Sequence, residues 1–243
     1  MPLQQRAQAL ADQLGLPKTR MGEPGCDLLL AVTEQRLELR VLVGKPGVVG
    51  GNPVYADPAA MDTASPAGKS LNSPLLKAVG IRKGKPDRPR VVDCTAGLGE
   101  DAWLLAARGC AVTALERQPV IAVLLDDALQ RAAAQDPQTA DRIKLIQADA
   151  AAWLAGTNTQ ADVILMDPMF PAGRKTTERK PMRVLRTLAG DDADAGGLFD
   201  AALATGAHRV VVKRPSHAPP LGDKTPTVVH KGRGHRLDVY VQG

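Results

Sequence analysis

The chain has 243 residues, of which 44% are hydrophobic, and a formal net charge of +5, so one large α/β domain with a small attachment is expected. No apolar run approaches the roughly 20 residues of a membrane-spanning helix, and residues 1–6 lack the apolar stretch of a signal peptide, which predicts a cytoplasmic protein with no membrane partner. The three cysteines, Cys26, Cys94 and Cys110, have neither metal-ligand spacing nor a disulfide pattern, so we expect buried, reduced thiols.

The first part of the chain predicts a small β-rich extension. Apolar residues at 28–33 and 37–43 are expected to pair as a hairpin across the turn at 34–36. Three further segments follow: a loop rich in Gly, Pro, Ala and Ser at 44–70, a short helix at 71–79 and a basic linker at 82–86. We therefore predict an N-terminal extension over residues 1–70 and a main domain over residues 71–243.

Strands that alternate with helices predict the fold of the main domain. The expected strands lie at 90–96, 111–116, 143–149, 162–167 and 209–213, and a final hairpin pairs 227–231 with 237–241. The expected helices lie at 102–108, 120–134, 150–154 and 198–204. This order predicts a doubly wound α/β fold with a mostly parallel sheet and an antiparallel edge. Such sheets bind ligands at the carboxyl ends of their strands.

A glycine turn after the first of these strands predicts the cofactor. Gly97 and Gly99 follow the apolar segment that begins at residue 90, and glycine allows the backbone to approach a ligand closely. Three acidic residues surround the turn: Asp93, Glu100 and Asp101. They would repel a pyrophosphate but attract a cation. We therefore expect S-adenosylmethionine (SAM), which carries a sulfonium and an ammonium group.

The ends of the next two strands carry further acids. Glu116 ends the second strand, roughly 20 residues after the glycine turn, a spacing typical of a carboxylate that binds ribose hydroxyls in either NAD or SAM. The turn has no third glycine at the dinucleotide position, which disfavours a nicotinamide enzyme. Asp149 follows the third strand and would accept a hydrogen bond from adenine, cap the next helix, or do both.

The fourth strand ends in Asp167-Pro168-Met169-Phe170-Pro171, which resembles the Asp-Pro-Pro-Tyr type motif of amino-group methyltransferases. The lone pair of an exocyclic amino group is delocalised into the base. A carboxylate at Asp167 and the carbonyl at Pro168 would hold its two N–H groups and direct the lone pair at a methyl donor. Phe170 would stack on the base. The motif predicts N-methylation, with Asp167, Pro168 and Phe170 as catalytic residues.

Charge is distributed unevenly along the main domain. Residues 90–169 carry 6 basic and 11 acidic side chains, residues 170–186 carry 6 and 1, and residues 206–236 carry 7 and 1. Basic segments beside an acidic pocket predict a polyanionic substrate, RNA or DNA. The candidate phosphate contacts are Arg174, Lys175, Lys180, Arg183, Lys213 and Arg214. We expect no metal, because His and Cys ligand clusters are absent from the sequence.

Over roughly residues 71–241 the chain resembles the J-type guanine-N2 methyltransferases of small-subunit ribosomal RNA. The matching segments include 93–101, 115–120, 167–171, 182–184, 209–215, 218–221 and 231–240. The resemblance implies a class I, Rossmann-like SAM-dependent methyltransferase with a seven-stranded sheet, which methylates N2 of a guanosine in the small-subunit RNA or the 30S subunit. It implies cofactor contacts at Glu100, Asp101, Glu116, Arg117, Asp149, Ala150 and Asp167. The chain departs from the family at Glu100, where arginine is usual, and at 64–70, where the family has a basic, Gly-rich stretch.

Two other readings of the sequence stay open. The same chemistry would serve another amino group, such as a DNA adenine or a protein amide. Alternatively, the chain would be a non-catalytic RNA-binding relic of the fold, which the intact glycine turn and the segment 167–170 disfavour.

Overall fold

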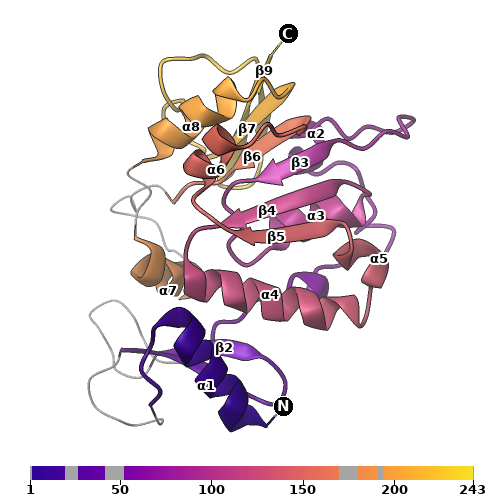
Figure 1. The fold of residues 1–243 in the computed structure, drawn as a ribbon. Coiled ribbons are helices and arrows are strands. Elements are labelled where there is room, and N and C mark those ends of the chain that lie inside the picture. Colours follow the sequence, from indigo (N-terminus) through magenta and orange to yellow (C-terminus); the bar gives the residue numbers. More distant parts are fainter. Residues whose placement is uncertain (1, 20–26, 42–51, 170–179, 191–193, 243) are drawn as a thin grey trace.

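The main domain is built around a seven-stranded sheet with the strand order β5-β4-β3-β6-β7-β9-β8 (Figure 1). The computed structural model describes the chain except for residues 1, 20–26, 42–51, 170–179, 191–193 and 243. The strands are β3 (Arg90–Asp93), β4 (Ala111–Glu116), β5 (Ile143–Gln147), β6 (Val163–Met166), β7 (Arg209–Pro215), β8 (Val228–Lys231) and β9 (His235–Val241). The five neighbouring strands β5, β4, β3, β6 and β7 are parallel, and β9 is antiparallel to both β7 and β8. The predicted mostly parallel sheet with an antiparallel C-terminal hairpin is confirmed.

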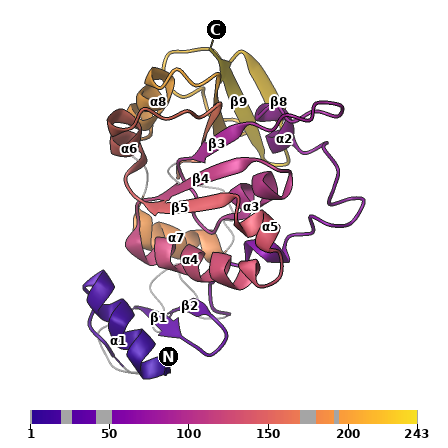
Figure 2. The ribbon, with the colours of Figure 1, turned by 45° about the vertical axis from the view of Figure 1, so that its right-hand side comes forward.

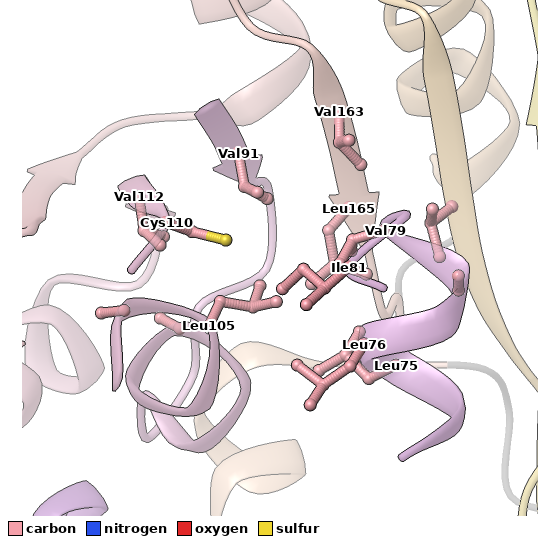
Figure 3. Close-up of a cluster of buried hydrophobic side chains, with 14 of the residues drawn as sticks. Leu75, Leu76, Val79, Ile81, Val91, Leu105, Cys110, Val112, Val163 and Leu165 are labelled. Carbon is pink, nitrogen blue, oxygen red and sulfur yellow. The ribbon is translucent and has the colours of Figure 1, made fainter. Parts of the chain in front are cut away.

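Helices cover both faces of this sheet. The helices of the domain are α2 (Pro74–Ala78), α3 (Glu100–Ala107), α4 (Pro119–Ala133), α5 (Pro137–Ala140), α6 (Ala150–Gly156), α7 (Lys180–Ala189) and α8 (Ala195–Ala204). Of these, α7 packs through Val184 with α4 and the N-terminal hairpin and not on the sheet. Successive strand residues point to opposite faces, so Val91 packs with α2 and α3, while Val92 packs with α6 and α8. Figure 3 shows the first of these cores, where Leu76 and Leu105 from the helices meet Leu165 of β6.

The N-terminal hairpin packs on the far side of α4 from the sheet (Figures 1 and 2). The hairpin is formed by β1 (Leu28–Val32) and β2 (Leu37–Val41), which are antiparallel as expected. Leu37 and Leu39 of β2 pack with Leu124 of α4. Asp127 of α4 accepts a hydrogen bond from the Leu37 N–H at 3.1 Å, which ties the hairpin to the main domain. A unit boundary near residue 70 stays a prediction.

Several elements differ in their bounds or their existence from those that the sequence predicts. The expected strand over 90–96 ends already at Asp93, because the backbone turns there toward the glycines. Four helical elements were not expected: α1 (Leu3–Leu14), the single-turn η1 (Pro58–Ala60), α5 and α7. Helix α1 has no fully buried residue, and in α7 the buried pair Val184 and Leu185 lies between arginines. Within the described ranges, no helix combines the length and apolar character that a membrane span requires.

Candidate functional site

The carboxyl ends of β3, β4, β5 and β6 surround a hollow of about 80 Å³. Six residues that the sequence singles out line this one hollow: Gly97, Glu116, Arg117, Asp149, Ala150 and Asp167. They come from four different loops, which the parallel sheet brings to the same edge. Met169, Ile121 and Leu198 add apolar surface that the sequence did not indicate.

The glycine turn requires glycine at both positions. Gly97 has φ of 53° and Gly99 has φ of 84°, a region of backbone conformation that other residues adopt only with strain. A Cβ at Gly99 would also lie 2.5 Å from Cδ1 of Leu125 in α4. The turn is therefore tied closely to α4, and α3 begins directly after it at Glu100. The side chain of Glu100 is exposed and does not line the hollow.

Glu116 links the ends of β3 and β4. One carboxylate oxygen accepts a hydrogen bond from the Gly97 N–H at 3.0 Å, and the other accepts one from the Gln118 N–H at 2.8 Å. The residue is only 8% exposed. A carboxylate offers about four acceptor positions, so these two bonds are compatible with the predicted contact to ribose hydroxyls.

Asp149, Ala150 and Arg117 also line the hollow. Oδ1 of Asp149 accepts a hydrogen bond from the Ala152 N–H at 2.9 Å, so Asp149 caps α6, one of the two roles left open from the sequence. Its predicted contact with adenine stays a prediction. Arg117 forms an ion pair of 2.9 Å with Asp194, which precedes α8. This pair joins the end of β4 to the start of α8 beside the hollow.

Asp167 lies directly after β6 at the rim of the hollow. Its N–H donates to Oγ1 of Thr95 at 2.7 Å, which ties the end of β6 to the glycine turn. Its carboxylate Oδ2 lies 2.9 Å from Nζ of Lys213, and the same Nζ lies 3.1 Å from Oδ2 of Asp101. Asp167, Lys213 and Asp101 therefore form a continuous bridge from β6 through β7 to the first turn of α3.

A third carboxyl group lies beneath this bridge. Asp93 is 3% exposed and accepts a hydrogen bond from the Thr95 N–H at 3.1 Å. Burial, followed by repulsion from Asp101, raises the pKa of Asp93 from 3.8 to about 7. Burial also raises the pKa of Asp167 above its ordinary value, although Lys213 opposes that shift.

The same surroundings keep the lysine charged. Burial works against the charge of Lys213, but the carboxylates of Asp167 and Asp101 outweigh burial and raise the pKa of Lys213 above its ordinary value. Among the described residues, one ammonium thus contacts a cluster of acidic groups that exceeds it in charge. A site with this excess of acidic groups fits a cationic ligand with a sulfonium and an ammonium group better than it fits a phosphate.

Comparison with known proteins identifies the family to which this chain belongs. A family model described as "Putative SAM-dependent methyltransferase" matches residues 9–242. A protein named ribosomal RNA small subunit methyltransferase J from Thioalkalivibrio sulfidiphilus is 44% identical, over 99% of this chain and 94% of the relative. A protein of the same name from Coxiella burnetii is 40% identical, over 97% of this chain and 91% of the relative. The chain belongs to the methyltransferase J family. The predicted enzyme class, a methyltransferase that uses SAM, is confirmed.

A solved structure supports the fold of this methyltransferase. The crystal structure of a SAM-dependent methyltransferase from Neisseria gonorrhoeae superimposes with a TM-score of 0.68 at 30% sequence identity. The match covers 97% of this chain and 91% of the other. The predicted class I fold is therefore confirmed over nearly the whole chain.

Of the predicted RNA-contact residues of this methyltransferase, the structure describes only some, and none of those lines the hollow. Phe170, Arg174 and Lys175 lie outside the described residues, and of Lys180 only the backbone, at the start of α7, is described. Arg183 is half-buried in α7. Arg214 is 6% exposed and donates to the carbonyl of Pro219 at 3.0 Å. Lys213 and Arg214 both have partners inside the protein, and the predicted phosphate contacts stay predictions.

Two features of the site were missed from the sequence. Thr95 joins Asp93 to Asp167 through its N–H and its hydroxyl, and a hydroxyl inside a glycine turn was the available signal. Lys213 was expected to contact phosphate, and its place beside Asp167 was not expected. Its place after Val210-Val211-Val212, at the carboxyl end of a parallel strand, was the signal for a role beside the ligand.

Proposed function

We propose that this methyltransferase transfers the methyl group of SAM to N2 of a guanosine in small-subunit ribosomal RNA. The observation that carries the proposal is the position of Asp167 at the rim of the same hollow that Gly97 and Glu116 line. The relatives that are 40–44% identical carry the name ribosomal RNA small subunit methyltransferase J, which supports the RNA substrate.

The acid-lined hollow would hold the cofactor along the carboxyl edge of the sheet. Glu116 would accept from the ribose hydroxyls, and Asp149 with Ala150 would contact the adenine. Asp93 and Asp101, which do not line the hollow but interact electrostatically with Asp167 at its rim, would stabilise the positive charges of the methionine part. When bound, SAM supplies a methyl group on a cationic sulfur.

Asp167 and Pro168 would orient the guanine. The carboxylate of Asp167 accepts one N–H of the exocyclic amine, and the carbonyl of Pro168 accepts the other, which aims the nitrogen lone pair into the hollow. The negative carboxylate would also stabilise the positive charge that grows on the nitrogen as the N–C bond forms and the methyl–sulfur bond breaks, with a neutral thioether as the leaving group. The proton then leaves the methylated nitrogen to this carboxylate or to water. Pro168 contributes rigidity, since its ring fixes φ.

The basic segments would hold the RNA backbone. The chain carries a balance of five positive charges over 170–186 and six over 206–236, next to an acidic cofactor side. Lysine and arginine residues that neutralise phosphates release counterions. We therefore expect the affinity for ribosomal RNA to fall steeply between low and physiological salt. An affinity that stays flat over this range would count against these segments as the RNA-binding surface.

The test is a comparison of methyl acceptors. Purified protein with labelled SAM is offered 30S subunits, free small-subunit RNA, DNA and protein, and the product is digested and analysed by mass spectrometry. We expect N2-methylguanosine in the RNA, loss of most turnover in Asp167→Ala, and wild-type turnover in the control Asp87→Ala, which changes an exposed aspartate far from the site. Methylated adenine in DNA or a methylated protein amide would reject the guanine assignment. Failure to bind SAM would revive the non-catalytic reading.

A further inference from the structure

The bridge made by Lys213 has no role in the chemistry derived so far. Lys213 belongs to β7 and is 26% exposed, with Nζ placed 2.9 Å from Asp167 and 3.1 Å from Asp101. Both distances are those of charge-assisted hydrogen bonds. A lysine that served RNA phosphates would instead extend its ammonium into solvent. The bridge therefore indicates a role that acts through Asp167.

The surroundings make an ionised Asp167 costly without this lysine. Asp93 approaches from β3 and Asp101 from α3, and both add negative charge or the potential for it. His235 at the start of β9 also faces Asp167. In a site of this kind, neighbouring carboxylates and burial both favour protonation of a carboxyl group. A protonated Asp167 would lose an acceptor oxygen and the negative charge on which the proposed transfer depends.

We infer that Lys213 is a positioning residue, whose ammonium holds the Asp167 carboxylate ionised and in a single orientation, with Asp101 as the second anchor of the bridge. The inference rests on the proposed function, because it concerns the group that would hold the guanine amine. Orientation matters as well as charge. The backbone N–H of Asp167 is held by Thr95 and its carboxylate by Lys213, so the residue is held from two sides.

The experiment follows the ionisation of Asp167 and the kinetics together. The carboxyl carbons of aspartate are labelled with ¹³C, the Asp167 signal is assigned by its loss in Asp167→Asn, and its titration midpoint is measured by NMR. The variants are Lys213→Met, Lys213→Arg, Asp101→Asn and His235→Gln. The matched control is Lys144→Met, an exposed lysine of β5. Methylation of ribosomal RNA is measured for each from pH 6 to pH 9.

We expect Lys213→Met to raise the midpoint of Asp167 by about 1–2 pH units and to lower kcat about 100-fold at pH 7. Raising the pH should recover part of this loss, while KM for the RNA changes less than about threefold. Lys213→Arg should retain most of the activity, because it keeps the charge. Asp101→Asn removes the competing carboxylate, so Lys213 then pairs with Asp167 only, and the titration midpoint of Asp167 should fall. His235→Gln should move the midpoint by less than Lys213→Met does.

The inference is overturned if Lys213→Met leaves the Asp167 midpoint at its wild-type value. It is also overturned if the loss lies in KM for RNA with kcat unchanged, the pattern of a phosphate contact. The NMR readout needs no turnover, so an inactive wild-type protein would reject the proposed function and still leave Lys213 testable. If Lys213→Met does not fold, the shift in Asp101→Asn decides: an unchanged midpoint in that variant rejects the bridge.

Discussion

Two aspartates in this protein are almost equally buried, yet their surroundings differ. Asp127 in α4 is 5% exposed, and Asp93 at the end of β3 is 3% exposed. Asp127 lies where the N-terminal hairpin meets the main domain, and it bonds to the Leu37 N–H and to the side chains of Arg6 and Arg131. Asp93 precedes Cys94 and Thr95, which line the hollow, and it accepts from the Thr95 N–H and is repelled by Asp101.

The two environments shift the two acids in opposite directions. Burial disfavours the charge of Asp127, but the Leu37 N–H and the two arginines outweigh burial and hold the pKa of Asp127 below 3.8. At Asp93, burial and then Asp101 raise the pKa to about 7. The hairpin interface thus satisfies its buried charge internally. Asp93, beside the hollow, has no cationic partner that outweighs its burial. A buried group with a perturbed pKa beside a cavity is typical of a site that binds a charged ligand.

The largest effect on stability is expected from Asp127→Ala. The change leaves the Leu37 N–H without its acceptor and removes the contacts of Arg6 and Arg131 with Asp127, so we expect the free energy of unfolding to fall by about 3–5 kcal/mol. Urea denaturation measures it. The neighbouring Asp126→Ala is the matched control, because Asp126 is exposed and should cost under about 0.5 kcal/mol. Equal losses in the two variants would contradict the anchoring role of Asp127.

Asp93 should make the folded protein less stable as the pH rises, and the variant Asp93→Asn tests this. Between about pH 4 and pH 7 the folded protein keeps a proton on Asp93 that the unfolded chain has released. The stability from this proton is present below pH 4 and is lost as the pH rises through 7. Relative to Asp93→Asn, the wild type should therefore lose about 2–3 kcal/mol between pH 4.5 and pH 8. Parallel pH profiles for the two proteins, by urea denaturation at each pH, would reject the raised pKa.

Gly99→Ala probes the turn above Asp93. Because φ is 84° and a Cβ would meet Leu125, we expect a loss of about 1–2 kcal/mol of stability and weaker binding of SAM. Gly156→Ala is the control, since it has no neighbour within 4 Å and no positive φ. Thermal denaturation and calorimetric titration with SAM check both variants. A Gly99→Ala protein that matched Gly156→Ala in both measurements would count against the required geometry.

The smallest effect is expected at the Arg117–Asp194 ion pair. Its side chains are 36% and 60% exposed, so water screens the interaction, in contrast to the pairs around Asp127. A double-mutant cycle with alanine should give a coupling energy below about 1 kcal/mol, which falls further in high salt. A coupling comparable to the loss in Asp127→Ala would mean that this pair is an anchor of the fold.

Much of the fold could be predicted because its signals are local. The apolar strands from residue 90 onward and the terminal hairpin follow from their periodicity and turns. Gly97, Glu116, Asp149 and Asp167 could be placed at one edge, because each follows a parallel strand. What could not be predicted depends on contacts between distant segments. The bond from Leu37 to Asp127 and the bridge from Lys213 to Asp101 join residues 90 and 112 positions apart.

The central claim is that the acid-lined hollow holds SAM with its sulfur facing Asp167. A crystal structure of the protein with S-adenosylhomocysteine tests this most directly. We expect the ribose at Glu116 and the sulfur within roughly 8 Å of the Asp167 carboxylate, the span of a methyl bond, a near-attack separation of about 3–3.5 Å and a hydrogen bond. A cofactor bound outside the hollow, or one with its sulfur turned away from Asp167 beyond that span, would contradict the account.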